Sequence, residues 1–127
     1  MKILIADEKN EIRSYIIEVL RLNVTGAVGT RFLEESDGRL ALAAILLERP
    51  DLVFLDMHLP KVDALRIMTT LKELTPELLE KTAIILLSGH SDKRILLEAM
   101  KTGARSIVAK PIDMEALLRN VEQVIKK

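Results

Sequence analysis

The chain has 127 residues, of which 49% are hydrophobic but only 2% aromatic, and it contains no cysteine. Its 19 basic and 19 acidic residues cancel to a formal net charge of zero and form no like-charged run, which argues against direct nucleic-acid binding. The missing cysteines exclude disulfides, thiolate zinc sites and cysteine nucleophiles. No apolar run is long enough for a signal peptide or a membrane span, so we expect a soluble cytoplasmic protein with one domain over residues 1–127.

Short apolar runs alternate with longer amphipathic segments along the whole chain. The apolar runs predict strands over residues 2–6, 28–33, 52–55, 82–87 and 107–109. Apolar residues at helical spacing predict helices around residues 12–20, 40–47, 65–71, 95–100 and 114–125. Asn10 is a candidate cap for the first helix, and Gly103 is expected to end the fourth.

Five strands that alternate with five helices predict a doubly wound α/β fold. Each right-handed crossover lays its helix across the sheet, so the strands should be mainly parallel with helices on both faces. Strands covered on both sides are continuously apolar, as in the run from Ile84 to Leu87. In such a sheet, ligands bind at the edge where the carboxyl ends of the strands meet.

Polar side chains follow four of the five predicted strands. Asp7 and Glu8 follow the first strand and Asp56 follows the third. Ser88 follows the fourth and Lys110 the fifth, whereas the second predicted strand ends without an obvious chemical group. Each residue also has an ordinary interpretation, because an acid or a serine after a strand can cap the next helix and a lone lysine is usually solvated.

The convergence of these residues favours a functional site. For the fourth helix, Ser91 and Asp92 are better cap candidates than Ser88. Three acids at one edge repel one another unless a cation lies among them, and hard oxygen ligands prefer Mg²⁺. A lysine can offset the charge of a phosphoryl group. The set is therefore suited to the transfer of a phosphoryl group to a carboxylate.

Four segments together resemble the response-regulator receiver domains of two-component signalling. ILIADEKNEIR is similar to the opening strand and acidic pair of that family, and DLVFLDMHLP to the segment around its phosphorylated aspartate. ILLSG resembles the strand that carries the family's hydroxyl residue, and AKPID the lysine–proline segment. The resemblance covers residues 2–127 and implies a five-stranded parallel sheet with the flavodoxin-like order 2-1-3-4-5.

The resemblance also implies a role for each polar residue at this edge. Asp56 would accept a phosphoryl group from a phosphohistidine on a sensor histidine kinase or a phosphotransfer protein. Lys110 and Ser88 would each contact one phosphoryl oxygen. The protein ligands of Mg²⁺ would be the carboxylates of Asp7, Glu8 and Asp56 and the backbone carbonyl of His58. Such a domain is a switch that catalyses its own phosphorylation and dephosphorylation, and not a metabolic enzyme.

The chain departs from the family pattern at two places. Ile107 stands where the family usually has a tyrosine or phenylalanine whose ring swings inward on phosphorylation. We therefore expect the switch to rely on the loop after Ser88 and on the fourth helix. The loop from Lys61 to Ala64 lacks the family's usual glycine, and we expect it to be stiffer for that reason.

The helix around residues 95–100 is apolar around more than one face, which leaves two interpretations open. It is either deeply packed, or it forms a surface together with Ile107 and the last helix. Such a surface would consist of the fourth helix, the fifth strand and the last helix. It would bind a second copy in a homodimer or a partner protein, and it would change conformation to transmit the output signal.

Three other functions compete with a phosphoacceptor domain. A phosphorylation-independent interaction module that keeps the fold is favoured by Ile107 and disfavoured by the complete set of acids, serine and lysine. A phosphohydrolase is disfavoured because His58 stands where a second acid is usual. A flavin carrier is disfavoured because ADEKNE is not a Gly/Ser/Thr-rich phosphate cradle. His58 and His90 either lie by coincidence near the site or flank the path of the water that removes the phosphate; a transition-metal site that uses both is a third, less favoured interpretation.

Overall fold

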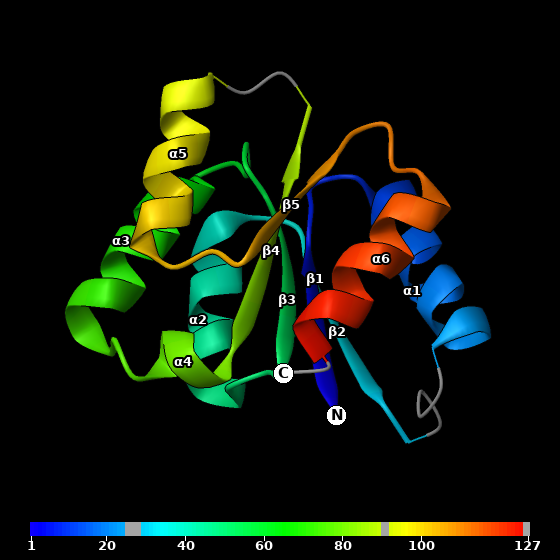
Figure 1. Cartoon of the computed structure of the whole chain (residues 1–127). Coiled ribbons are helices and arrows are strands. Elements are labelled where there is room, and N and C mark those ends of the chain that lie inside the picture. The colour runs from blue at the N-terminus through cyan, green and yellow to red at the C-terminus, as the bar shows by residue number, and fades with distance from the viewer. Residues whose placement is uncertain (25–28, 90–91, 126–127) are drawn as a thin grey trace.

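The computed structural model describes residues 1–24, 29–89 and 92–125 and contains a sheet of five parallel strands (Figure 1). The order across the sheet is β2-β1-β3-β4-β5, which confirms the predicted fold class and topology. The strands are β1 (Lys2–Ala6), β2 (Arg31–Glu35), β3 (Leu52–Asp56), β4 (Ala83–Ser88) and β5 (Ser106–Ala109).

Helices cover both faces of the sheet. Helices α1 and α6 lie on one face, and α2, α3 and α5 lie on the other (Figure 1). A short helix, α4, precedes β4 and was not predicted, because four residues are too few for a periodic pattern. None of the helices in the described part of the chain is long and apolar enough to cross a bilayer. The helices are α1 (Asn10–Asn23), α2 (Gly38–Glu48), α3 (Ala64–Leu74), α4 (Leu78–Lys81), α5 (Lys93–Thr102) and α6 (Met114–Ile125).

The sheet separates two aliphatic clusters. Successive side chains of a strand point to opposite faces. Val53 and Leu55 therefore pack with α2, α3 and α5, whereas Leu52 and Phe54 pack with α1 and α6. All five residues of β3 are buried. A strand buried on both faces has a fixed register, so the residue at its carboxyl end, Asp56, has a fixed position.

The second strand differs from its prediction. It runs from Arg31 to Glu35 and not over residues 28–33, and Val28 lies outside the described residues. β2 is an edge strand with exposed or half-buried side chains, so its apolar pattern is a weak guide to its bounds. Because Glu34 and Glu35 close the strand, the prediction that its end carries no chemical group is wrong.

The helix ends agree in part with the predictions. The carboxylate of Asp92 caps α5 by accepting a backbone N–H at 2.8 Å, and Gly103 ends that helix with a φ of 130°. Ser91 lies outside the described residues. Asn10 is the first residue of α1 and not its cap, because Lys9 takes the cap position and makes no side-chain cap hydrogen bond.

Candidate functional site

The ammonium of Lys110 joins two acids that come from different strands. Its Nζ lies 2.7 Å from Oδ2 of Asp7, which follows β1, and 3.1 Å from Oδ1 of Asp56, which ends β3. The exposed fraction of the side chain is 1% for Asp7, 10% for Asp56 and 19% for Lys110. Carboxylates with so little access to water need a counter-charge. The lysine supplies it for both acids at once.

The two carboxylates in turn stabilise the charge of the lysine. Burial by itself would lower the pKa of Lys110, but the hydrogen bonds to Asp7 and Asp56 and their negative charges outweigh burial and raise that pKa above its usual value. Lys110 is therefore protonated at neutral pH and brings a fixed positive charge to the edge of the sheet.

Asp7 is held in a single orientation by its neighbours. Its Oδ1 accepts the backbone N–H of Lys9 at 2.8 Å while its Oδ2 binds Lys110. Its own backbone N–H donates to the carbonyl of Glu35 at 3.1 Å, which ties the loop after β1 to the end of β2. The first acid of the site is thus fixed at both its carboxylate and its peptide group.

Helix capping accounts for other acids near this edge but not for the predicted pair after β1. Asp37, Asp63 and Asp92 each accept a backbone N–H in the first turn of α2, α3 and α5. The cap position of α1, in contrast, belongs to Lys9, so neither Asp7 nor Glu8 caps that helix. Helix capping therefore does not explain Asp7 and Glu8, the two acids for which a functional role was predicted.

Ser88 lies at the same edge as the acids and the lysine. It ends β4, has an exposed fraction of 6%, and pairs with Ala109 of β5. The carbonyl of Ser88 accepts the backbone N–H of Lys110 at 2.8 Å. On its other side, the N–H of Met57 donates to the carbonyl of Leu87 at 3.0 Å, so the loop after Asp56 runs along the end of β4.

The remaining predicted residues lie at the rim or outside the described part of the chain. Glu8 and His58 are exposed, and His90 is not among the described residues. Within residues 1–24, 29–89 and 92–125, no three His, Asp or Glu side chains converge as a ready-made metal cluster. The structure brings together Asp7, Asp56 and Lys110, and it leaves Glu8 beside them at the surface.

The donor set is compatible with a hard divalent cation. Asp7 and Asp56 each place a carboxylate oxygen within 3.1 Å of the same ammonium, so two hard oxygen donors converge at this edge. Mg²⁺ keeps several water ligands and needs only one or two protein carboxylates, so it does not require a complete protein cage. The observed pair, with Glu8 next to it in sequence, fits that requirement.

Glu35 and Asp37 are acids near this edge that the sequence analysis missed. Burial raises the pKa of Glu35, the charge of Asp37 raises it further, and Arg13 opposes the shift. The hydrogen bond from the N–H of Leu40 lowers the pKa of Asp37. The misplaced end of β2 hid both residues, although the parallel register that pairs Ala6 with Glu35 would have revealed them.

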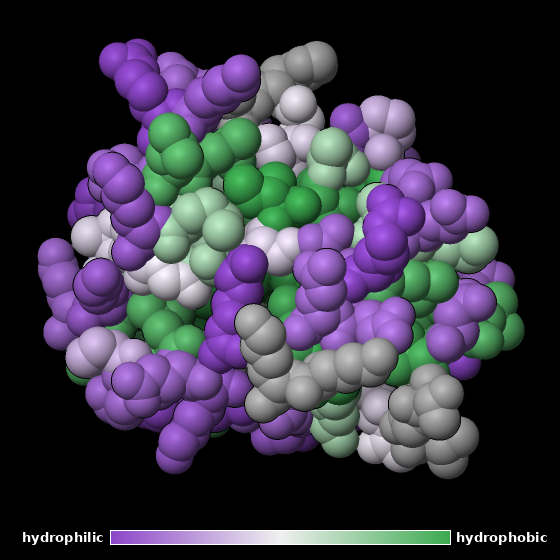
Figure 2. Space-filling view, viewed as in Figure 1, coloured by the Kyte–Doolittle hydropathy of each residue, from purple (hydrophilic) through white to green (hydrophobic). Residues whose placement is uncertain are grey.

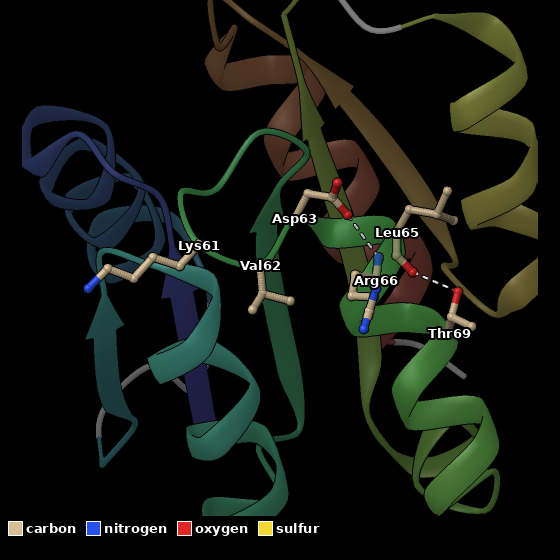
Figure 3. A pocket seen from close by; sticks show the side chains of 6 residues that line it. All are labelled: Lys61, Val62, Asp63, Leu65, Arg66 and Thr69. Atoms are coloured by element: carbon tan, nitrogen blue, oxygen red, sulfur yellow. Dashed lines mark hydrogen bonds between the residues drawn. The ribbon is translucent and has the colours of Figure 1, made fainter.

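The loop after β3 is held by backbone contacts to α2. The N–H of Gly38 donates to the carbonyl of Pro60 at 2.9 Å, and a Cβ at Gly38 would lie 1.6 Å from the carbonyl oxygen of Val62. Lys61 has a φ of 73°, in the left-handed region that favours glycine. A hollow of about 570 Å³ lies beside this loop at the start of α3; Figure 3 shows its lining side chains, which include neither Asp56 nor Lys110.

The surface formed by α5, β5 and α6 is apolar and accessible. Only Ala99 of α5 is buried, whereas Ile95 and Leu97 have exposed fractions of 39% and 60%. The interpretation of this helix as deeply packed is therefore wrong. Ile107 is half-buried on β5, and Figure 2 shows apolar surface between α5 and β5.

The fold and the site define a member of a signalling family. The chain belongs to the response regulator receiver domain family, whose model matches residues 3–122. Members of this family act as switches in two-component signal transduction and are not metabolic enzymes.

Individual relatives are similar over nearly the whole chain. Sporulation initiation phosphotransferase F of Bacillus subtilis is 29% identical over 98% of this chain and 93% of its own length. Response regulator ArlR of Staphylococcus epidermidis is 27% identical, and the chain spans 52% of it. Nitrogen assimilation regulatory protein NtrX of Azorhizobium caulinodans is 29% identical, and the chain spans 26% of it. Among solved structures, a response regulator receiver domain protein from Clostridium thermocellum has a TM-score of 0.81 at 28% identity, covering 98% of this chain and 94% of that one.

Proposed function

We propose that this chain is a phosphoacceptor domain of a two-component phosphorelay and that Asp56 is the phosphorylated residue. The observation that carries the proposal is the pair of contacts from Lys110 to Asp7 and Asp56. An anionic nucleophile is repelled by an anionic phosphoryl group unless positive charge offsets the repulsion. The half-buried, protonated lysine supplies such charge 3.1 Å from the nucleophilic carboxylate.

The other residues at this edge complete the phosphoryl site. A carboxylate oxygen of Asp56 attacks phosphorus as the P–N bond to the donor histidine breaks, and the imidazole leaves with the electron pair of that bond. Lys110 pairs with one oxygen of the transferred group. Ser88 donates its hydroxyl hydrogen to another. Bound Mg²⁺ would neutralise charge on the phosphoryl oxygens. Its protein ligands would be the carboxylates of Asp7, Glu8 and Asp56 and the backbone carbonyl of His58.

Positioning and charge neutralisation are the whole of the chemistry that these residues supply. β3 is buried on both faces, so the Asp56 carboxylate is held in place by the sheet and not by a flexible loop. Such a site accelerates transfer from any activated donor that reaches it. The domain would therefore catalyse its own phosphorylation and its own dephosphorylation. Small phosphodonors would supply the phosphoryl group in addition to a kinase.

The donor would be a histidine kinase or a phosphotransfer protein in the cytoplasm. A hollow of about 450 Å³ adjoins the site, between the start of α1 and the segment after β5. It is lined by Glu11, Ile12, Tyr15, Lys110, Pro111 and Ile112. Because Lys110 forms part of both the hollow and the phosphoryl site, an apolar segment of the donor seated here would bring its phosphohistidine close to Asp56.

The output surface would be the face made of α5, β5 and α6. Ile107, Leu96 and Met100 all pack at the edge of the same apolar cluster, which joins α5 and β5 to the core. Ile95 and Leu97 are exposed apolar residues of α5, but residues two apart on a helix do not share a face, so only one of them can add apolar contact area to this surface. An isoleucine does not report phosphorylation by rotation of a ring, so the signal would pass through the segment after Ser88 into α5.

Intact-mass measurement after incubation with Mg²⁺ and acetyl phosphate tests the proposal. We expect one added phosphoryl group on the parent chain and none on the Asp56→Asn variant. EDTA should abolish the uptake. Absence of uptake from acetyl phosphate and from kinases alike would instead support the phosphorylation-independent interaction module.

The role of His58 is tested with the same material. If its side chain affects the path of the hydrolytic water, the His58→Ala variant should lose its phosphoryl group at a rate different from that of the parent. An unchanged lifetime of the aspartyl phosphate would show that the position of His58 is incidental.

A further inference from the structure

Arg13 donates hydrogen bonds to the backbone of both acids that follow β1 and to two further side chains. Its Nη1 donates to the carbonyl oxygen of Asp7 at 2.6 Å and to that of Glu8 at 3.3 Å. Its Nη2 donates to Oδ1 of Asn10 at 3.2 Å, and its Nε to Oε1 of Glu34 at 3.1 Å. The exposed fraction of the side chain is only 14%, although it carries a full charge.

These contacts replace a cap that the sequence does not provide. The cap residue of α1, Lys9, makes no side-chain hydrogen bond to the helix, so the loop from β1 into α1 has no such anchor. The guanidinium reaches back from the first turn and binds the two carbonyls that precede the cap. A planar fork with five N–H donors can hold two neighbouring carbonyls in one arrangement, which an ammonium on a flexible stem does less well.

Glu34 forms an ion pair with Arg13 and thereby reduces the electrostatic effect of Arg13 on its neighbours. A bare guanidinium next to two acids would weaken the binding of a cation by electrostatic repulsion. The ion pair between Arg13 and Glu34, at 3.1 Å, offsets that positive charge from β2. The ion pair reduces the effect of this charge on the acid pair, and the direct contacts of Arg13 with Asp7 and Glu8 are those to their backbone carbonyls.

We propose that Arg13 is a positioning residue for the divalent-cation site. Arg13 holds the carbonyls of Asp7 and Glu8 in place. This fixed backbone sets the direction in which the exposed Glu8 carboxylate points. The inference rests on the proposed function, because it requires that Mg²⁺ binds at the acid pair.

Magnesium binding to the unphosphorylated protein, measured by isothermal titration calorimetry, tests the inference without any phosphoryl transfer. For Arg13→Met we expect the dissociation constant for Mg²⁺ to rise about tenfold, as for other residues that orient metal ligands. Arg13→Lys should also bind Mg²⁺ more weakly than the parent, because it keeps the charge but loses the fork. At saturating Mg²⁺, the rate of phosphorylation by acetyl phosphate should return close to that of the parent.

Arg21→Met is the matched control. Arg21 lies on the same helix, and its guanidinium carbon lies 5.2 Å from the centre of the Phe32 ring, away from the acid loop. Its loss should leave the affinity for Mg²⁺ unchanged. A backbone NMR spectrum adds a structural readout, since the N–H of Lys9 is bonded to Asp7 and its chemical shift should move in Arg13→Met but not in Arg21→Met.

Parent-like affinity for Mg²⁺ in a folded Arg13→Met variant would overturn the inference while leaving the proposed function intact. If that variant does not fold, Arg13→Lys takes its place. Parent-like affinity in Arg13→Lys would then overturn the inference equally. A parent chain that does not bind Mg²⁺ would overturn both the inference and the magnesium-dependent function.

Discussion

Asp7, in the loop after β1, and Asp56, at the end of β3, both contact Lys110, but the loops that follow these two strands are held in different ways. In the loop after β1, a side chain holds the backbone, because Arg13 binds the carbonyls of Asp7 and Glu8. In the loop after β3, the backbone is held by other backbone, because the N–H of Gly38 donates to the carbonyl of the proline that follows Asp56 by four residues. The loop after β1 depends on the side chain of Arg13. The loop after β3 depends on the absence of a side chain at Gly38.

This difference separates the consequences of substitution. A change in the loop after β1 should alter the affinity for a cation more than it alters the free energy of unfolding. A change where α2 meets the loop after β3 should alter the free energy of unfolding directly, because two backbone segments are in contact there. Of the four variants below, Gly38→Ala and Lys61→Gly test the contact of α2 with the loop after β3. Lys110→Met and Glu35→Gln change residues that contact Asp7 of the loop after β1.

Gly38→Ala should have the largest effect. The new Cβ would lie 1.6 Å from the carbonyl oxygen of Val62, so α2 and the loop must separate. We expect a loss of about 3 kcal/mol in the free energy of unfolding, at the upper end of the range for overpacking, measured by urea denaturation. Gly89→Ala is the control, because a Cβ at Gly89 would meet no atom within 4 Å. Equal stability of the two variants would show that the contact between the two segments is unimportant.

Lys110→Met removes the ammonium group that contacts both Asp7 and Asp56. Asp7 and Asp56 would then face each other without a counter-charge, and we expect a loss of about 2 kcal/mol in EDTA, less than for a fully buried pair because the lysine is partly exposed. Addition of Mg²⁺ should recover part of that loss. Lys101→Met, at an exposed site on α5, should lose little. Thermal unfolding with and without Mg²⁺ measures both effects, and a loss that Mg²⁺ leaves unchanged would argue against a shared cation site.

Lys61→Gly should stabilise the protein. Lys61 has a φ of 73°, which costs a residue with a Cβ about 1 kcal/mol, and glycine removes that cost. The expected net gain is about 0.5 kcal/mol, because the flexible glycine also stabilises the unfolded chain. Lys61→Ala separates the backbone effect from the loss of the 3.8 Å ion pair with Asp37, since alanine keeps the strain. A gain of equal size in Lys61→Ala would show that relief of the left-handed φ is not the cause of the stabilisation.

Glu35→Gln should have the smallest effect and one that depends on pH. Burial and the charge of Asp37 raise the pKa of Glu35 above 4.5, so the folded state binds this proton more tightly than the unfolded state. Stability contributed by the protonated group is therefore lost as the pH rises from about 4.5 through the folded pKa. Glutamine does not ionise, so the variant should melt at a higher temperature than the parent at pH 7 and show no gain at pH 4. Glu18→Gln, at an exposed site on α1, should show no such dependence.

The fold was predictable because its signals are local and repeated. β1 was predicted with its exact bounds, and β3 and β4 were predicted to within a residue at each end, since strands buried on both faces are continuously apolar. β2 was misplaced because an edge strand is exposed to solvent and carries little hydrophobic signal. That error concealed Glu35, whose position depends on the pairing of β2 with β1.

The site was predictable where it depends on topology alone. Parallel strands end at one edge, so Asp7, Asp56 and Lys110 could be grouped without coordinates although up to 103 residues separate them. Arg13 was not identified, because an arginine in the first turn of a helix has many acceptors within reach. Only the path of the loop after β1 selects the carbonyls of Asp7 and Glu8 among them.

The amino-acid sequence by itself determined the alternation of strands and helices and the ends of the strands at which charged residues lie. These features follow from hydrophobic periodicity and from the geometry of parallel sheets. Only the tertiary structure decided which acids cap helices and which share a lysine, because capping and ion pairing use the same side chains. The choice between them depends on distances of a few ångströms that packing alone sets.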